Sequence, residues 1–301
     1  MKSVTIKFCI AFFVLLSCSV FAQDFQGVAT YQSKTTIDFD GFGGRQMSEE
    51  QKKQIAERMK SMFEKTYQLT FNKFESIYKE EDKLEAPDGG GGFRMGFMSN
   101  FSGGKQYKNV KDNQMLQEQE FFGKQFLVKD SLAKLEWKMG TESKQIGQYL
   151  CFKATAVKKV NDTDFMNFRR RNTSNDEEKK EGEVEKDSTA KDSTKTTNPL
   201  DEIEIPKEME VTAWYTPQIP VNQGPDEYWG LPGLILEVDA GRTTILCSKI
   251  VINPKDKEAI EVPSKGKEVT RREYSDIVKQ KIEEMRETFG ARNRGNFRRN
   301  D

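Results

Sequence analysis

The chain has 301 residues, of which 32% are charged and 35% are hydrophobic, and its 48 lysines and arginines balance its 48 aspartates and glutamates. A balanced charge creates no long-range field toward nucleic acids or anionic membranes, so we expect neither as a partner. The sequence contains no histidine. This excludes the commonest general base, the commonest metal ligand and every nucleophile that depends on imidazole. We therefore expect no metal or other cofactor.

The amino terminus has the form of a secretory signal peptide. Lys2 and Lys7 precede and border an apolar stretch at residues 8–16, and small or polar residues then lead to Ala22, the expected cleavage site. The apolar run is about half of the ~20 residues that a membrane-spanning helix needs, so we expect an exported protein without a transmembrane segment. Its location would be the periplasm or the outer membrane. Acylation of Cys18, as in a lipoprotein, is the less favoured alternative.

After the signal peptide (residues 1–22), we expect a single β-rich domain over residues 23–289. A glycine-rich loop at 88–104 carries several phenylalanines and methionines. Residues 169–198 contain no aromatic residue and too few apolar ones to offset the entropy of ordering, which predicts a disordered acidic insertion. Residues 290–301 form a basic tail, which we also expect to be disordered.

In chain order, residues 25–36 alternate as a strand does, and Ser48 and Gln51 have the spacing of a helix capping box. The residues at helical spacing after that box are Ile55, Met59, Met62 and Phe63. Further strand-like runs predict strands at 67–71, 76–78, 107–110, 115–121, 125–129, 135–139, 144–158, 210–217, 234–238 and 243–252. The run at 234–238 is almost continuously apolar, which suggests burial on both sides. Thr270 and Glu273 have the spacing of a second capping box, and the helix after it ends at Gly290.

The breaks between these strands are short and rich in turn-forming residues, one of them at Gly140-Thr141. Parallel strands need crossovers of about a dozen residues, so the sheet is expected to be mostly antiparallel. The predicted fold class is α+β, mainly β: a curved, mostly antiparallel meander sheet with an amphipathic helix near each end. A half-barrel is the more closed form of the same arrangement.

Outside the signal peptide the chain has two cysteines, Cys151 and Cys247, each in an apolar, strand-like stretch. In an exported protein, neighbouring strands would bring them within reach of a disulfide. Two buried thiols that act as small apolar side chains are the equal alternative.

The run from Trp229 to Val238 reads WGLPGLILEV. In it, Pro232 followed by Gly233 has the pattern of a type II turn, with a positive φ at the glycine. The first interpretation is structural: the turn directs the chain into the apolar strand predicted at 234–238. The alternative is a pocket with an aromatic floor, whose binding residues would be Trp229, Trp214, Tyr215, Leu231, Pro232 and Gly233.

The same run resembles the signature of the GLPGLI family of Gram-negative envelope proteins. Residues 107–139, 146–155 and 213–225 and the carboxy-terminal amphipathic helix are also similar to that family. The resemblance implies an envelope protein whose natural partner is an outer-membrane uptake receptor, by analogy alone. It implies no reaction, because the molecular function of such proteins is poorly defined.

Carboxylate pairs are the remaining route to catalysis, as in glycosidases. Glu118 with Glu120, or Glu237 with Asp239, would project from one face of a strand. Among 48 acidic residues such spacings arise by chance. We therefore favour a non-catalytic exported protein that binds an apolar ligand or an outer-membrane partner. A carboxylate-based hydrolase acting on envelope glycans or peptides is the alternative.

Overall fold

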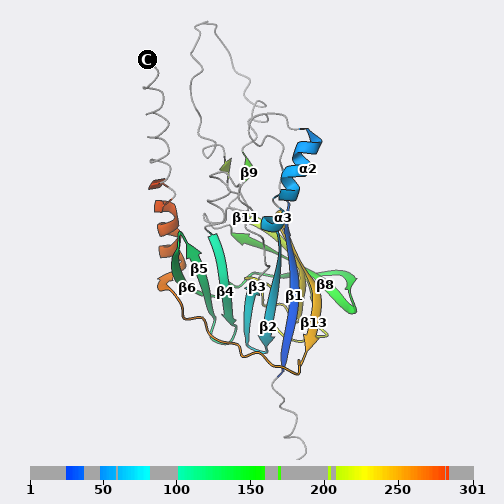
Figure 1. Ribbon diagram of the computed structural model, residues 1–301. Coiled ribbons are helices and arrows are strands. Elements are labelled where there is room, and N and C mark those ends of the chain that lie inside the picture. The colour runs from blue at the N-terminus through cyan, green and yellow to red at the C-terminus, as the bar shows by residue number, and fades with distance from the viewer. Residues whose placement is uncertain are drawn as a thin grey trace, which may run out of the picture.

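A computed structural model describes residues 25–36, 48–58, 60–81, 101–159, 169–170, 203–204, 208–281 and 283–284 (Figure 1). The predicted signal peptide, residues 88–100 of the predicted glycine-rich loop, residues 171–198 of the predicted insertion and the predicted tail lie outside the described residues. The described ends of the predicted loop and of the predicted insertion are strands. Residues 101–104 begin one strand, and residues 169–170 form another.

The described elements are mainly strands. In chain order they are β1 (Gln26–Thr35), α2 (Glu49–Arg58), α3 (Lys60–Phe63), β2 (Glu64–Asn72), β3 (Glu75–Glu80), β4 (Phe101–Asn109), β5 (Gln114–Phe121), β6 (Lys124–Ser131), β7 (Lys138–Ile146), β8 (Tyr149–Lys159), β9 (Arg169–Arg170), β10 (Ile203–Glu204), β11 (Glu208–Thr216), β12 (Leu234–Ala240), β13 (Thr243–Ile252) and β14 (Lys267–Thr270). A helix follows β14 at residues 271–281 and continues at 283–284.

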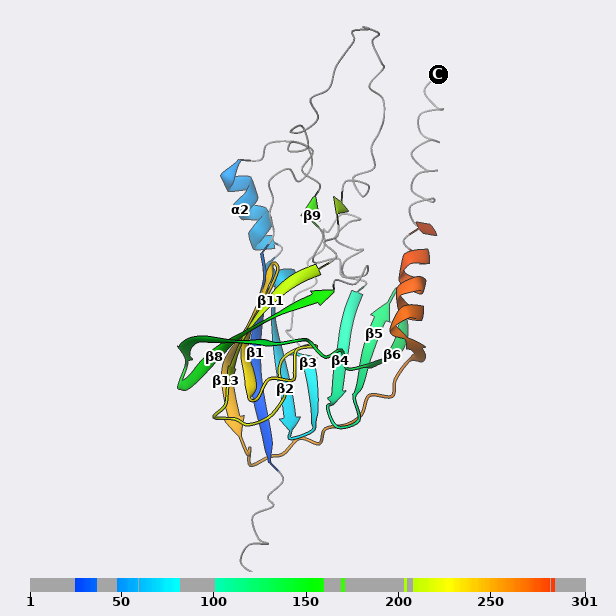
Figure 2. The same cartoon turned by 180° about the vertical axis from the view of Figure 1, so that it is seen from behind.

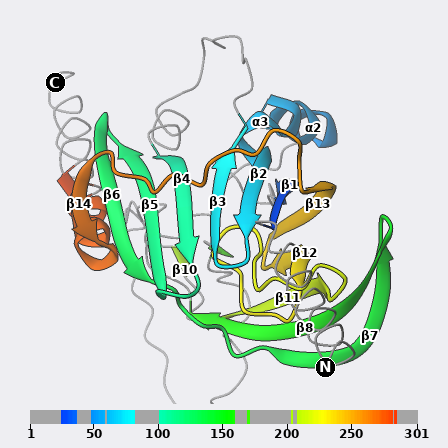
Figure 3. The same cartoon turned by 90° about the horizontal axis from the view of Figure 1, so that it is seen from below.

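Twelve strands form one open sheet in the order β14-β6-β5-β4-β3-β2-β1-β13-β12-β11-β8-β7, and β9 and β10 form a separate pair. Seen from below, the large sheet bends into an arc, with β6 and β7 near its two ends (Figure 3). Seen from behind, β8 and β11 lie in front of β1 and β2, so the end of the sheet that contains them folds back over its middle (Figure 2). Neighbouring strands are antiparallel except β14 and β6, which run parallel. The prediction of a mainly β protein with a curved, mostly antiparallel sheet is confirmed.

The middle of the sheet shows why these residues form strands. In β2, Leu69 and Phe71 alternate with polar residues and are both fully buried. Phe71 stands opposite Gly27 of β1, where an added Cβ would lie 2.8 Å from the Phe71 ring atom Cε1 and closer still to Cζ. Gly27 therefore makes room for a large ring beside it, as glycines in strands often do.

Each face of the sheet is covered differently. On one face, the main core joins residues of strands β1, β2, β3, β8, β11, β12 and β13. On the opposite face of the β3–β6 half, Ile77, Tyr107, Leu116 and Leu127 form a small cluster against Ile260. Residue 260 belongs to the segment between β13 and β14, which runs across the strands (Figure 1).

The predicted strand at 144–158 is wrong, because these residues form a hairpin. β7 and β8 pair antiparallel through Ile146 and Tyr149, and the turn between them contains Gly147 with φ at +58°. The predicted turn at Gly140-Thr141 lies inside β7 instead. Short polar residues there signal a break, but in the structure they form an irregularity within the strand, where its register with β8 shifts.

Strand β14 was not predicted from the sequence. Its four residues contain a single apolar side chain, Val269, which is 6% exposed, so no alternating pattern marks it. The capping box directly after it is confirmed. The backbone N–H of Thr270 donates to Glu273 Oε2 at 2.8 Å, and the N–H of Glu273 donates to Thr270 Oγ1 at 3.2 Å. The helix buries Val278 against β5, β6 and β14.

The first capping box is also confirmed. The N–H of Ser48 donates to Gln51 Oε1 at 3.1 Å, and the N–H of Gln51 donates to Ser48 Oγ at 3.3 Å. In the apolar stripe predicted after it, the side chains of Ile55, Met59 and Met62 lie outside the described part, and Phe63 is half-buried. Among the described helices, none is long and apolar enough to cross a membrane.

Candidate functional site: the inner loop and the concave face of the sheet

The run from Trp229 to Val238, which contains most of the predicted binding residues, begins in the long connection between β11 and β12. We call residues 217–233 the inner loop, because they lie inside the arc of the sheet (Figure 3). Ile219, Val221, Tyr228 and Leu231 bury their side chains there, each at most 4% exposed. Strand side chains that contact the inner loop therefore point to the concave face of the sheet.

The predicted type II turn at Pro232-Gly233 is wrong. A positive φ occurs at Gly230, +92°, and not at Gly233. The N–H of Gly233 donates instead to the carbonyl of Leu231 at 2.8 Å, which is a three-residue turn centred on Pro232. Gly233 is needed for a close approach, because an added Cβ would lie 2.5 Å from the carbonyl carbon of Thr216 and closer to its oxygen.

Trp229 is held by the connection between β6 and β7. Its indole Nε1 donates to the carbonyl of Ala133 at 3.0 Å, and Trp137 Nε1 donates to the carbonyl of Trp229 at 2.8 Å. Leu231 is fully buried and Pro232 is exposed. These two indole-to-carbonyl hydrogen bonds thus hold the inner loop against residues 132–137.

Trp214 makes its contacts elsewhere. The Nζ of Lys144, on β7, lies 4.3 Å from the centroid of the Trp214 ring and 2.5 Å from Oε1 of Glu237, on β12. The neighbouring Tyr215 is 8% exposed, and the register of β11 and β12 shifts between it and Trp214. Trp229 and Trp214 therefore bind different elements, and the aromatic pocket floor that their sequence positions suggested stays a prediction.

A lysine that the sequence analysis did not single out anchors the inner loop. Lys108 of β4 is fully buried, and its Nζ donates to the carbonyls of Gly224 at 2.6 Å, Asp226 at 2.5 Å and Tyr228 at 3.4 Å. Three acceptors match the three N–H bonds of an ammonium group. Burial lowers the pKa of Lys108 to about 7, although the negative charges of Asp226 and Glu227 act in the opposite direction.

The backbone of the loop fits around this ammonium. Asp226 adopts a φ of +48°, and the N–H of Tyr228 donates to the carbonyl of Pro225 at 3.1 Å. At Gly224 an added Cβ would lie 2.7 Å from the carbonyl oxygen of Tyr228, so a larger residue would push apart two of the carbonyls that Lys108 binds. Sequence patterns gave no signal for Lys108, because its neighbour Tyr107 carries the apolar alternation of β4 on the other face.

Next to Lys108, β3 contributes a group of buried polar atoms. Ser76 Oγ donates to Gln223 Oε1 at 2.8 Å. The Nε2 of Gln223 and the hydroxyl of Tyr78 are buried without a hydrogen-bond partner in the described part of the chain. The Tyr78 ring stacks on Tyr67 with centroids 4.7 Å apart. Burial, and then the charge of Asp226, raise the pKa of Tyr78 well above its ordinary value.

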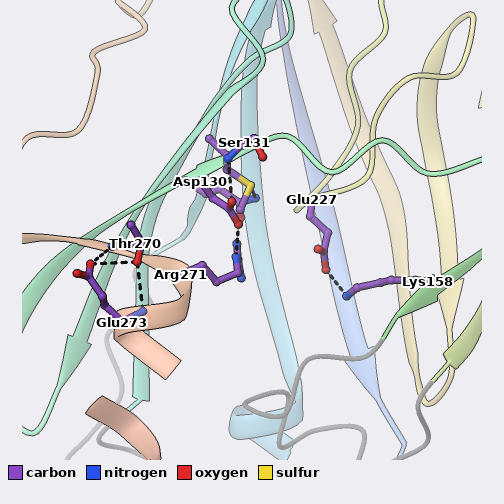
Figure 4. Close-up of polar contacts among 9 residues, drawn as sticks. Asp130, Ser131, Lys158, Glu227, Thr270, Arg271 and Glu273 are labelled. Atoms are coloured by element: carbon purple, nitrogen blue, oxygen red, sulfur yellow. Dashed lines mark hydrogen bonds and ion pairs between the residues drawn. The ribbon is translucent and has the colours of Figure 1, made fainter. Parts of the chain in front are cut away.

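Figure 4 shows two ion pairs, one at the inner loop and one at the carboxy-terminal helix. Lys158 of β8 pairs with Glu227 of the inner loop, and the lysine side chain is only 10% exposed. Arg271 Nε, at the start of the carboxy-terminal helix, lies 2.6 Å from Asp130 Oδ2 of β6. Since Lys158 belongs to β8 and Lys108 to β4, the inner loop is bound by charged side chains from both halves of the arc.

The predicted carboxylate pairs have other partners. Glu237 is ion-paired with Lys144, and Asp239 accepts a hydrogen bond from Thr244 Oγ1 at 2.7 Å. Glu118 is half-buried and Glu120 is exposed. In the described residues, no group of three or more acidic or cysteine side chains is placed to hold a metal ion.

Cys151 and Cys247 are buried, free thiols. They lie on β8 and β13, which are separated by β11 and β12, so the premise that neighbouring strands bring them together does not hold. Burial raises the pKa of Cys151 to about 11 and that of Cys247 to about 12.

Residues 137–237 match the family model Porph_ging. That model is described as a protein of unknown function. The Porph_ging segment runs from the start of β7 into β12 and contains the whole inner loop, but it does not contain Lys108, Ser76 or Tyr78. No match to the chain was found among the curated proteins.

Among solved structures, the chain is similar to two titled "Structure of PNGF-II in C2 space group" and "Structure of PNGF-II in P21 space group". Both give a TM-score of 0.44 at 14% sequence identity, over 84% and 83% of this chain. The chain spans only 32% of the length of PNGF-II. At this TM-score the likeness carries no argument about fold or function.

Proposed function

We propose that this chain is an exported, non-catalytic envelope protein of the GLPGLI kind, which binds a ligand or an outer-membrane partner on its concave face. The half-barrel form of the sheet, and a helix near each end that covers part of it, belong to this proposal. So do cleavage after Ala22 and a periplasmic or outer-membrane location. An uptake receptor is the natural partner by analogy.

One observation carries the proposal. The hydroxyl of Tyr78 and the Nε2 of Gln223 are buried beside the inner loop without a hydrogen-bond partner in the part of the chain that the structure describes. Leaving a buried polar group unsatisfied costs about 1–3 kcal/mol, so such groups are rare in folded proteins and need an explanation. A ligand or partner that supplies polar atoms at this point would satisfy both groups.

The lining of the concave face bears on the kind of ligand. Lys108 and Lys158 bind the inner loop, Glu227 belongs to it, and the apolar side chains of the loop are already packed against the core. Burying charges against an apolar molecule is costly. The geometry therefore favours a ligand or partner segment with hydrogen-bonding groups over the apolar ligand that was the other expectation.

Native mass spectrometry of the protein purified from its own envelope tests this. We expect the wild type to retain a ligand or partner, and Tyr78→Phe to lose it, because this variant removes only the unpartnered hydroxyl. Tyr274→Phe is the matched control. Its hydroxyl is also buried without a partner in the described residues, but it lies against Phe126, where the carboxy-terminal helix packs.

If the wild type retains nothing, or if the two variants lose the bound species equally, the group of polar atoms at Tyr78 and Gln223 is not the binding site. The alternative function, a carboxylate-based hydrolase acting on envelope glycans or peptides, makes a different prediction. It requires turnover of such a substrate by the purified protein, and loss of that turnover in Glu237→Gln with the fold intact.

A further inference from the structure

Strand β7 is one end of the sheet and is open to a partner. It pairs with β8 and with no other strand among the described residues. Seven of its nine residues, including all from Lys138 to Ser143, are exposed. An edge strand presents backbone N–H and C=O groups that can pair with another strand, which is why many proteins protect their edges with charges or bulges.

The charges along this edge alternate in a self-complementary way. Within β7 the chain reads Lys138, Gly140, Glu142 and Lys144 at every second position. If two copies pair antiparallel with Gly140 opposite Gly140, then Lys138 faces Glu142 of the second copy, and Glu142 faces its Lys138.

We propose that β7 pairs antiparallel with β7 of a second copy of this chain, about a two-fold axis at Gly140. The resulting interface is isologous, the commonest kind in homodimers. Strand alternation puts the three charged positions, Lys138, Glu142 and Lys144, on one face. Contacts within one chain show that Glu142 and Lys144 share a face. Glu142 Oε1 bonds Lys153 at 2.8 Å, and Lys144 lies over the ring of Trp214, which is paired with Lys153 across β11 and β8.

The centre of β7 also has unused pairing capacity. Met139 stands opposite Ala154 and Ser143 opposite Phe152, so residues 140–142 share one opposing residue, Lys153. Their backbone is not engaged in a regular ladder with β8. A second copy would pair with the N–H and C=O groups of β7 that point away from β8. Gly140 has no side chain to hinder close approach at the axis.

The competing explanation is that the charges and the irregular register serve to prevent pairing. Charges of one sign would repel a second copy of the same strand in every register. Alternating signs allow a second copy to pair in one register, with opposite charges facing each other. With the axis moved to Thr141, Lys138 would face Lys144, so the charges select the register at Gly140 over this one.

Sedimentation equilibrium of the full chain tests the proposal. We expect the wild type to dimerise, and Lys138→Glu and Glu142→Lys each to weaken the dimer about tenfold or more, because the two-fold axis doubles every changed pair. The double variant Lys138→Glu/Glu142→Lys restores the wild-type affinity. Lys124→Glu, an exposed lysine of β6, is the control and leaves the dimer intact.

The double variant also distinguishes the registers. With the axis at Ser143, position 142 faces Lys144, so Glu142→Lys would bring two positive charges together and the double variant would not recover. Because Glu142 also bonds Lys153 within the single chain, Lys138→Glu is the cleaner single variant, and far-UV circular dichroism checks the fold of each. A monomeric wild type at the highest soluble concentration, or a double variant no better than the single ones, overturns the proposal.

Discussion

Replacing Lys108 by methionine tests whether one buried ammonium holds the inner loop. Methionine keeps most of the length and the apolar stem of lysine but has no donor. The carbonyls of Gly224, Asp226 and Tyr228 would then lose the N–H groups that lie 2.5–3.4 Å from them. The matched control is Lys105→Met, the same change at an exposed position of the same strand.

The size of the effect follows from two opposing costs. Each buried carbonyl left without a donor costs about 1–3 kcal/mol if it stays dry. Removing the ammonium also removes its desolvation penalty, which is several kcal/mol and acts the other way. We expect a net loss of about 2–4 kcal/mol in the free energy of unfolding, because three buried carbonyls lose their donor at once. In a domain of this size that lowers the Tm by about 5–15 °C.

Chemical denaturation followed by tryptophan fluorescence is a suitable assay, because Trp229 lies in the inner loop itself. We expect the midpoint to fall in Lys108→Met and to stay within about 0.5 kcal/mol of the wild type in Lys105→Met, as is usual for surface changes. Equal, small effects of the two variants would refute the reasoning. They would mean that the three carbonyls find water or other donors at little cost.

Close packing, thiol burial and the lysine pKa each lead to a further prediction. Gly233→Ala should lower the free energy of unfolding by about 2 kcal/mol or more, because its Cβ meets the backbone of Thr216; Gly123→Ala, where no atom lies within 4 Å but φ is +70°, should cost only about 1 kcal/mol. Cys151 and Cys247 should resist alkylation in the folded protein, since burial raises their pKa values to about 11 and 12, and both should be alkylated after denaturation without reductant; protection after denaturation would instead reveal a disulfide. Stability should rise with pH above 7, because the unfolded chain holds the lysine proton more tightly than the folded one, where the pKa is lowered to about 7. Denaturation curves between pH 7 and 9 should show this rise in the wild type and a flatter profile in Lys108→Met.

The mainly β fold could be predicted because most strands carry their own pattern. The run at 243–252 is rich in β-branched residues, and the structure places β13 at Thr243–Ile252. The helix starts were equally local, since a capping box is defined by residues three positions apart, such as Thr270 and Glu273. Features that depend only on neighbours in the chain can be derived from the chain.

Features that depend on contacts between distant parts of the chain could not be predicted from the sequence. Gly147 rather than Gly140 forms the turn of the β7–β8 hairpin, and nothing in the local sequence separates these two glycines. Val269 marks β14 only when its partner β6 is known. The role of Gly233 depends on the backbone of Thr216, 17 positions earlier, and a turn pattern could not reveal that close approach.

Lys108 shows most clearly why the candidate site lay beyond sequence reasoning. Tyr107 and Lys108 project to opposite faces of β4, and both are buried, because β4 has covered faces on either side. The segment that matches Porph_ging, residues 137–237, supplies the three carbonyls, whereas the ammonium that binds them comes from β4 and the serine that binds Gln223 comes from β3. The inner loop is therefore held by parts of the chain on both sides of that boundary. A functional unit drawn at the limits of the matched segment would contain the acceptors of the anchor and lack its donor, so the site belongs to the whole sheet.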